Sequence, residues 1–183
     1  LGCGSVILGA SETAGRLFLR VDALVKEKSL SLDEAASEVV REAGAVSVLI
    51  DYASAPDGLG DAIALGGVDL TKPEAAAAAI NAVREKVGGI DALLNIAGGF
   101  RWSKVEDADA SVWDAMYAIN TKTAVNASRA ALPHLIAAKG AIVNVGANGA
   151  LKAGAGFAPY AASKQGVHKL TEALAEELKG KVR

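Results

Sequence analysis

Tyr160 and Lys164 are the two residues whose types and spacing point most directly to chemistry. They lie four positions apart in the chain, so on a helix their side chains share one face. A tyrosine has an ordinary pKa of about 10 and exchanges protons poorly at neutral pH unless a positive charge stabilises its phenolate. We therefore expect Lys164 to lower the pKa of Tyr160 and the pair to act in acid–base catalysis. A surface tyrosine with an ordinary lysine one turn later is the alternative interpretation.

The composition limits the kinds of protein in which this pair can act. The chain has 183 residues, 51% of them hydrophobic and 22% charged, which predicts one globular domain spanning residues 1–183. A net charge of −2 with scattered basic residues argues against a nucleic-acid partner and favours a small-molecule substrate. We expect no membrane partner, because no apolar run approaches the roughly 20 residues of a membrane span and the first residues lack a signal-peptide pattern. The single cysteine, Cys3, excludes an internal disulfide and fits a cytoplasmic location.

The alternation of apolar runs and helical patterns predicts the fold. Short β-rich runs are followed by alanine-rich stretches with helical spacing, which is typical of an α/β protein with a doubly wound parallel sheet of the Rossmann type and three α/β/α layers. Thr71, Pro73 and Glu74 mark a helix start, and glycines at 88 and 140 mark helix ends. The expected strands are 6–9, 46–50, 62–68, 90–95 and 141–145, and the expected helices are about 14–28, 31–43, 73–87, 109–138 and 158–179.

A glycine turn follows the first expected strand and precedes a helical stretch. In dinucleotide-binding units such a turn lets the backbone approach a pyrophosphate, and the helix N-terminus presents free N–H groups to it. Thr13 stands at the middle glycine position, and Glu12 places a negative charge nearby. A glycine turn that only packs a helix is the alternative. The candidate cofactor-binding residues of this turn are Gly9, Ser11, Thr13, Ala14 and Gly15.

An acidic residue ends the second expected strand. Asp51 follows an apolar run, and a carboxylate at this place accepts hydrogen bonds from the adenosine ribose and disfavours a 2′-phosphate. We therefore expect the cofactor to be NAD, with NADP less favoured. The separation between Gly15 and Asp51 is 36 residues, which is longer than the usual 20 or so and leaves room for two helices. A solvated strand end is the alternative for Asp51.

Four further segments, in order and with the expected spacing, resemble the short-chain dehydrogenase/reductase family over nearly the whole chain. Asp69 and Leu70 are similar to the family's adenine-contacting segment, and the run from Asn95 through Ala97 to Gly98 is similar to its Asn-Asn-Ala-Gly motif with one change. Asn120 precedes Tyr160 by 40 residues, as the family's catalytic asparagine does. The resemblance implies an NAD(P)-dependent oxidoreductase in which Tyr160 moves a proton. It further implies that Lys164 holds the nicotinamide ribose and that Asn120 orders a water. Tyr160, Lys164, Asp69, Leu70, Asn95, Ala97 and Gly98 thus join the expected cofactor site.

The chain departs from the family pattern at two places. Ala147 stands where the family has a catalytic serine, and residues 145–150 contain neither serine nor threonine; Asn148 is an alternative donor. Quinonoid dihydropteridine reductases of the same superfamily are similar here, which suggests a conjugated substrate. The sequence also stops at Arg183, directly after the last expected helix, so we expect a shortened form that lacks the family's last strands.

These departures leave two other functions open: a non-catalytic dinucleotide-binding sensor or subunit, and an inert structural fragment. We expect a homodimer or homotetramer through the helices at about 109–138 and 158–179, as the resemblance implies. No metal is expected, because His134 and His168 lack neighbouring ligands at suitable spacing. Trp102 and Trp113 are interpreted as packing residues.

Overall fold

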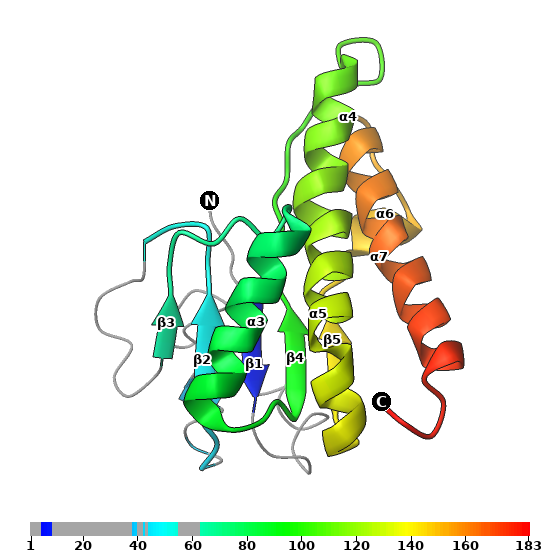
Figure 1. The fold of residues 1–183 in the computed structure, drawn as a ribbon. Coiled ribbons are helices and arrows are strands. Elements are labelled where there is room, and N and C mark those ends of the chain that lie inside the picture. Colours follow the sequence, from blue (N-terminus) through cyan, green and yellow to red (C-terminus); the bar gives the residue numbers. More distant parts are fainter. Residues whose placement is uncertain (1–4, 9–37, 40–41, 43, 55–62) are drawn as a thin grey trace.

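The fold is a five-stranded sheet covered by helices (Figure 1). The computed structural model describes residues 5–8, 38–39, 42, 44–54 and 63–183. The elements in chain order are β1 Ser5–Leu8, β2 Ser47–Ile50, β3 Ile63–Leu65, α3 Pro73–Val87, β4 Ala92–Asn95, α4 Ala110–Tyr117, the π-helical turn η1 Ala118–Lys122, α5 Thr123–Ala138, β5 Ala141–Asn144, α6 Asn148–Leu151 and α7 Ala158–Glu177.

The strand order is β3-β2-β1-β4-β5, and the pairs β2–β3 and β4–β5 run parallel. This order confirms the prediction of a doubly wound α/β fold. In such a sheet the chain moves outward in both directions from the centre, and ligands bind beyond the carboxyl ends of the strands near the reversal. The functional side chains should therefore gather where β2, β3, β4 and β5 end.

One strand departs from the predicted parallel sheet. β1 runs antiparallel to both of its neighbours, with Leu8 opposite Ser47 of β2 and opposite Ala92 of β4. The run from Val6 to Leu8 is continuously apolar, so it has no polar face to fix its direction, and either direction satisfies its hydrogen bonds. The chain consequently leaves β1 at the amino ends of β2 and β4, at the edge opposite to Asp51 and Asn95.

The core lies between one face of the sheet and two helices. Figure 1 shows α3 and α5 side by side in front of the strands, and these two helices pack on one another. The predicted helices at about 14–28 and 31–43, which would form the third layer, fall largely outside the described residues. Apolar side chains of the strands and helices form the core cluster, including Val48, Ile50, Ile80, Val83, Leu93, Ala131 and Leu135.

The ends of α3 show how local sequence limits a helix. Pro73 occupies the first turn, where its missing N–H costs nothing. Lys72 caps the helix without a side-chain hydrogen bond, so Thr71, predicted to mark the start, has another role described below. Gly88 ends the helix with φ of 83°, in the left-handed region that glycine adopts without strain.

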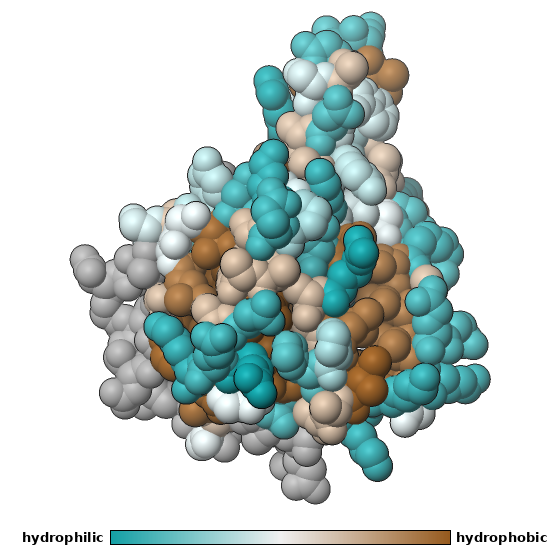
Figure 2. All heavy atoms as spheres, in the orientation of Figure 1, coloured by the Kyte–Doolittle hydropathy of each residue, from teal (hydrophilic) through white to brown (hydrophobic). Residues whose placement is uncertain are grey.

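Helix α4, the turn η1 and helix α5 form one rod that extends beyond the carboxyl ends of the strands, with α7 along its upper part (Figure 1). Figure 2 shows hydrophobic side chains gathered over the lower part of this face and mostly hydrophilic ones towards the projecting end. The chain ends beside β5, where Arg183 donates to Gly140 O at 3.0 Å and accepts from Ile142 N at 2.8 Å. Among the described residues, no helix combines the length and apolar character that a membrane crossing requires.

Candidate active site

Asn120 lies at the centre of the π-helical turn η1 and is 1% exposed. Its Nδ2 donates to Gly99 O and to Ser163 Oγ, both at 3.0 Å, and its Oδ1 accepts from Gly99 N at 2.9 Å. π-helical turns are rare and are frequent at functional sites. Both amide hydrogens are thus already donated to protein groups. The side chain of Asn120 joins the segment after β4 to helix α7, and its N–H groups are not available to hold a water.

Gly98 lies where the groups of the predicted site converge. A Cβ added at this glycine would lie 2.6 Å from Asn120 Oδ1 and 3.2 Å from Lys164 Nζ. Both polar atoms therefore approach the backbone of the segment after β4. The prediction that Gly98, Asn120 and Lys164 belong to one site is consistent with this geometry, and it explains why position 98 requires a glycine.

Lys164 is buried, with 6% of its surface exposed, and its Nζ donates to Val145 O at 2.8 Å. Val145 directly follows β5, so this hydrogen bond ties helix α7 to the carboxyl end of the strand at one edge of the described sheet. A buried ammonium requires such partners, because burial without them is costly. Ser163, the preceding residue, donates to Tyr160 O at 2.7 Å and accepts from Asn120. The helix turn from Tyr160 to Lys164 is thus fixed at several points.

Tyr160 is half-buried and packs edge-to-face against Phe100, with ring centroids 4.9 Å apart and planes at 88°. Burial raises the pKa of Tyr160 above its usual 10.0, because removal from water disfavours the phenolate. The prediction that Lys164 lowers this pKa is wrong for this arrangement. The Lys164 ammonium is engaged at Val145, and burial is the cause that acts on the phenol.

Ala147 adopts an extended conformation, with φ of −156°, directly before the short helix α6. Its methyl group donates no hydrogen bond, and the neighbouring Asn148, the predicted substitute donor, is exposed. Gly149 lies closer to the tyrosine, since an added Cβ there would meet Phe157 at 3.1 Å and Tyr160 Cε1 at 3.7 Å. The side of Tyr160 that faces α6 is therefore made of small residues and an aromatic ring.

A cavity of about 610 Å³ opens at the carboxyl ends of β2, β3 and β4. Asp69 in its wall accepts from Thr71 N at 3.0 Å and from Thr71 Oγ1 at 2.6 Å. The hydroxyl of Thr71 is the main cause that holds the pKa of Asp69 below its usual 3.8, aided by the Thr71 N–H, Lys72 and Lys122 against the opposing effect of burial. The lining residues are Ile50, Tyr52, Ala53, Val68, Asp69, Leu70, Thr71, Ala97, Gly98, Ile119 and Thr123.

The other predicted cofactor residues have different surroundings. Asp51 is 6% exposed, its Oδ1 accepts from Ala53 N at 2.9 Å, and it does not belong to the cavity lining. Asn95 is 4% exposed and donates to Ser128 Oγ at 3.0 Å and to Asn144 Oδ1 at 2.8 Å, while its own buried Oδ1 has no hydrogen-bond partner among the described residues. Four predicted residues thus line the cavity: Asp69, Leu70, Ala97 and Gly98. The glycine-turn residues Gly9, Ser11, Thr13, Ala14 and Gly15 lie outside the described residues.

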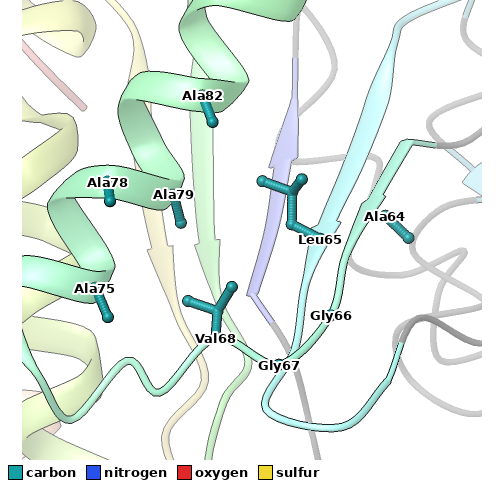
Figure 3. Close-up of a pocket in the computed structure, with 9 residues that line it drawn as sticks. All are labelled: Ala64, Leu65, Gly66, Gly67, Val68, Ala75, Ala78, Ala79 and Ala82. Atoms are coloured by element: carbon teal, nitrogen blue, oxygen red, sulfur yellow. The ribbon is translucent and has the colours of Figure 1, made fainter.

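A second cavity, of about 460 Å³, lies between β3 and the alanine-rich face of α3 (Figure 3). Its lining consists of aliphatic side chains and glycines, so it offers no group for acid–base chemistry or for holding a polar ligand. We assign it to packing. The lining residues are Ala64, Leu65, Gly66, Gly67, Val68, Ala75, Ala78, Ala79 and Ala82.

Two features of the site are absent from the sequence-based prediction. The imidazole of His168 lies directly against Gly146, at a distance that leaves no room for a Cβ. His168 follows Lys164 by four residues, so the same helical spacing that relates Tyr160 to Lys164 was the available signal. The second feature is a group of aromatic rings around Tyr160, to which Trp102 contributes by packing over Gly156. Phe100 and Trp102 lie far in the sequence from Phe157 and Tyr160, and no local pattern connects the two pairs.

Comparison with known proteins gives consistent matches. The sequence model of the short chain dehydrogenase family matches residues 52–183. The 2-(S)-hydroxypropyl-CoM dehydrogenase 3 of Xanthobacter autotrophicus is 34% identical over 154 residues, which are 80% of this chain and 60% of that protein. The meso-2,3-butanediol dehydrogenase of Serratia marcescens is 34% identical over 153 residues, covering 79% of this chain and 60% of that protein. The chain thus spans about 60% of the length of these relatives.

Solved structures agree with the fold. The NADH-dependent reductase A1-R′, in a complex with NAD, superposes with a TM-score of 0.73 and 28% identity, over 83% of this chain and 70% of that one. The aldohexose dehydrogenase of Thermoplasma acidophilum superposes with a TM-score of 0.69 and 24% identity, over 74% of this chain and 52% of that one. At that identity the second likeness concerns the fold alone.

Proposed function

Because this chain belongs to the short-chain dehydrogenase/reductase family, we propose that it forms the cofactor-binding and catalytic part of an oxidoreductase. The reaction would transfer hydride between a nicotinamide cofactor and a small carbonyl or alcohol substrate. One observation carries the proposal. Asn120 Oδ1 and Lys164 Nζ both lie beside Gly98, and Tyr160 lies one helical turn before Lys164, at the carboxyl edge of the sheet where such folds bind nucleotides.

The residues around the cavity suit a dinucleotide. Its volume of about 610 Å³ is of the size that cofactors occupy, Asp69 offers carboxylate oxygens at its wall, and Gly98 leaves space that a side chain would fill. Asp69, Leu70, Ala97 and Gly98 would hold the cofactor along this edge, and Lys164 would hold its nicotinamide ribose. The contribution of the glycine turn at Gly9–Gly15 stays a prediction.

NAD is the cofactor we favour over NADP. The buried carboxylate of Asp51 ends β2, and its negative charge disfavours a 2′-phosphate nearby. The relative complexed with NAD has the same fold. Dissociation constants for NADH and NADPH, measured by fluorescence enhancement, test this choice, and an Asp51→Ser variant should reduce the difference between them.

Side chains of this protein would transfer the proton. The cofactor supplies the hydride when it is bound. As the substrate carbon receives the hydride, the substrate oxygen accepts a proton from the Tyr160 hydroxyl, and solvent later returns a proton to the phenolate. Since burial raises the pKa of Tyr160, the hydroxyl carries its proton at neutral pH, as donation to a substrate oxygen requires, but it is a weaker acid than a free phenol.

NADH oxidation with a panel of ketones, quinones and pterins tests the proposal. We expect turnover with at least one class, and a Tyr160→Phe variant should lose it by a factor of about 10² to 10⁴ while it still binds NADH. Binding of NADH with no turnover across the panel would contradict the proposal and favour a nucleotide-binding sensor. Ala147, in place of a residue with a hydroxyl group, is the observation behind that second candidate. Self-association through α4, α5 and α7 stays a prediction, which sedimentation can test.

A further inference from the structure

Half of the aromatic residues of the chain gather around the acid–base tyrosine. The sequence contains three phenylalanines, three tyrosines and two tryptophans, and four of these eight make up what we name the aromatic cluster. The rings of Phe100, Phe157 and Tyr160 contact one another, and Trp102 packs on Gly156, the residue before Phe157. Phe100 packs against Phe157 with ring centroids 5.0 Å apart and against Tyr160 at 4.9 Å, both edge-to-face. Contacts between aromatic rings thus join the segment after β4 to the segment after α6, although the two lie far apart in the sequence.

The backbone holds these loops in place. Ser103 N donates to Gly156 O at 2.9 Å, and the indole of Trp102 lies directly over Gly156, whose φ of 79° and lack of a Cβ permit the contact. Edge-to-face packing is the geometry that aromatic quadrupoles favour. The arrangement is therefore a defined wall beside Tyr160, with each ring placed by its neighbours.

The wall presents a large apolar area to solvent. Phe100 is 49% exposed and Trp102 is 55% exposed, although both take part in these contacts. Exposed aromatic faces that lie together mark a place where an apolar partner binds, because their contact with water is unfavourable.

Small residues lie on the α6 side of the tyrosine, and the amide of Asn148 there is exposed. Ala147 and Gly149 carry no polar side chain, and Gly149 lies against the rings of Phe157 and Tyr160. A substrate here is held by contact with rings and receives its proton from Tyr160.

We propose that the substrate is an aryl ketone, that is, a carbonyl conjugated to a flat aromatic ring, whose ring packs against Phe100 and Trp102. This rests on the proposed function and names its substrate class. The carbonyl carbon gains the hydride from NADH and the oxygen gains a proton through Tyr160, which gives a secondary aryl alcohol and NAD⁺. The flat ring matches the flat faces of the wall, whereas a saturated ring of equal size is thicker and has no π system to pair with them.

The test compares two ketones of similar size, 2-acetylnaphthalene and its saturated analogue 2-acetyldecalin. With NADH in excess, we expect kcat/KM to be at least about tenfold higher for the naphthyl ketone. Phe100→Leu and Trp102→Leu should each reduce this ratio by about two- to tenfold, which is the size of a lost aromatic contact. Tyr117→Leu removes another exposed aromatic side chain, 55% exposed on α4, and should leave the ratio unchanged. A ratio near one, or a ratio that neither cluster variant alters, overturns the proposal.

A binding measurement separates this proposal from the proposed function. Equilibrium dialysis of both ketones against Tyr160→Phe with NADH reports affinity without turnover. Preferential binding of the naphthyl ketone, lost in Phe100→Leu, supports the substrate class even if no ketone is reduced, a result that would contradict the proposed function alone. Equal reduction and equal binding of both ketones would overturn the aryl preference and leave the oxidoreductase standing.

Folding and association have to be checked in the same variants. Should Trp102→Leu unfold, Trp102→Phe keeps a ring over Gly156 and should retain most of the preference. Sedimentation of Phe100→Leu shows whether the cluster instead serves self-association. A loss of oligomers with an unchanged ketone ratio would overturn the proposal in favour of a protein-docking surface.

Discussion

The Nζ of Lys164 donates a hydrogen bond of 2.8 Å to the carbonyl oxygen of Val145. This bond links the helix that carries Tyr160 to the end of β5, and it places a buried ammonium next to the loop that contains Gly146 and Ala147. The position of the lysine therefore depends on the shape of that loop as well as on its own helix.

Gly146→Ala should disturb this loop. The new methyl group would collide with the imidazole of His168, and overpacking of this kind costs about 1–3 kcal/mol. For a chain of this size, each kcal/mol lowers the melting temperature by about 2–4 °C. Differential scanning calorimetry measures the change, and NADH oxidation should fall with it because Lys164 is displaced.

His168→Ala should rescue Gly146→Ala by removing the colliding ring. The double variant should recover most of the lost melting temperature, with a coupling energy of about 0.5–3 kcal/mol. His134 on α5 offers a matched control, since His134→Ala removes the other histidine and should recover nothing. Additive effects of Gly146→Ala and His168→Ala would contradict the contact.

Gly98→Ala should impair the site without unfolding the protein. Its methyl group would lie 2.6 Å from Asn120 Oδ1 and 3.2 Å from Lys164 Nζ, so one of these groups has to move. NADH affinity, measured by fluorescence, should fall at least about tenfold, since the cofactor is expected along this backbone. Gly89→Ala is the matched control, because nothing lies within 4 Å of the added atom. Equal affinity in both variants would show that Gly98 is not in the site.

The pH dependence of turnover should follow the raised pKa of Tyr160. Its folded-state pKa lies above 10.0, so the phenol keeps its proton at pH 6–9, and ketone reduction should not vary through this group in that range. Alcohol oxidation needs the phenolate as base, so its rate should rise with pH through 9 and 10. Steady-state rates in both directions measure this. A break near pH 7 that disappears in Tyr160→Phe would instead indicate a lowered pKa.

Stability at high pH offers a second test of the same shift. A raised folded-state pKa gives stability that is fully present below the unfolded value near 10 and is lost as the pH rises through the folded value. Tyr160→Phe has no proton to lose. Urea unfolding above pH 10 should therefore show a smaller loss of stability for the variant than for the parent chain.

Asp69→Asn should lower the free energy of unfolding at neutral pH and leave it unchanged in acid. Hydrogen bonds from Thr71 hold the pKa of Asp69 below 3.8, so the carboxylate gives stability that is present above the unfolded pKa and is lost as the pH falls through the folded one. Because Asp69 is half-exposed, the effect is on the order of 0.5 kcal/mol. Urea unfolding at pH 7 and below pH 3 should show a difference that disappears in acid.

Much of the fold follows from local patterns in the sequence. The helix predicted over 73–87 has those bounds in the structure, because Pro73 and Gly88 impose local conformations that few residues share. Strands β2, β4 and β5 fall where continuous apolar runs predict them. The direction of β1 was missed, since strand polarity depends on which neighbours the chain reaches and a short apolar run is satisfied in either direction.

The sequence predicts those parts of the candidate site that depend on residue spacing along one helix or on a short motif. Asn120 Oδ1 and Lys164 Nζ lie close to Gly98, as a shared site requires, and the assignment of the three residues to that site stays a prediction. Local patterns do not predict the hydrogen bond from Lys164 to Val145, or the burial that raises the pKa of Tyr160. Both depend on the distance between a helix and a strand end, which tertiary packing decides.

The π-helical turn at Ala118–Lys122 lies between α4 and α5 and changes the direction in which the side chains of α5 point relative to those of α4. One extra residue in a turn rotates everything after it by about 100° relative to a regular helix. Before the turn the rod packs on α7, and after it the rod packs on α3. Loss of one residue between the two halves would turn one half away from its neighbour. A change of length in this rod should therefore disturb its packing more than a conservative substitution does.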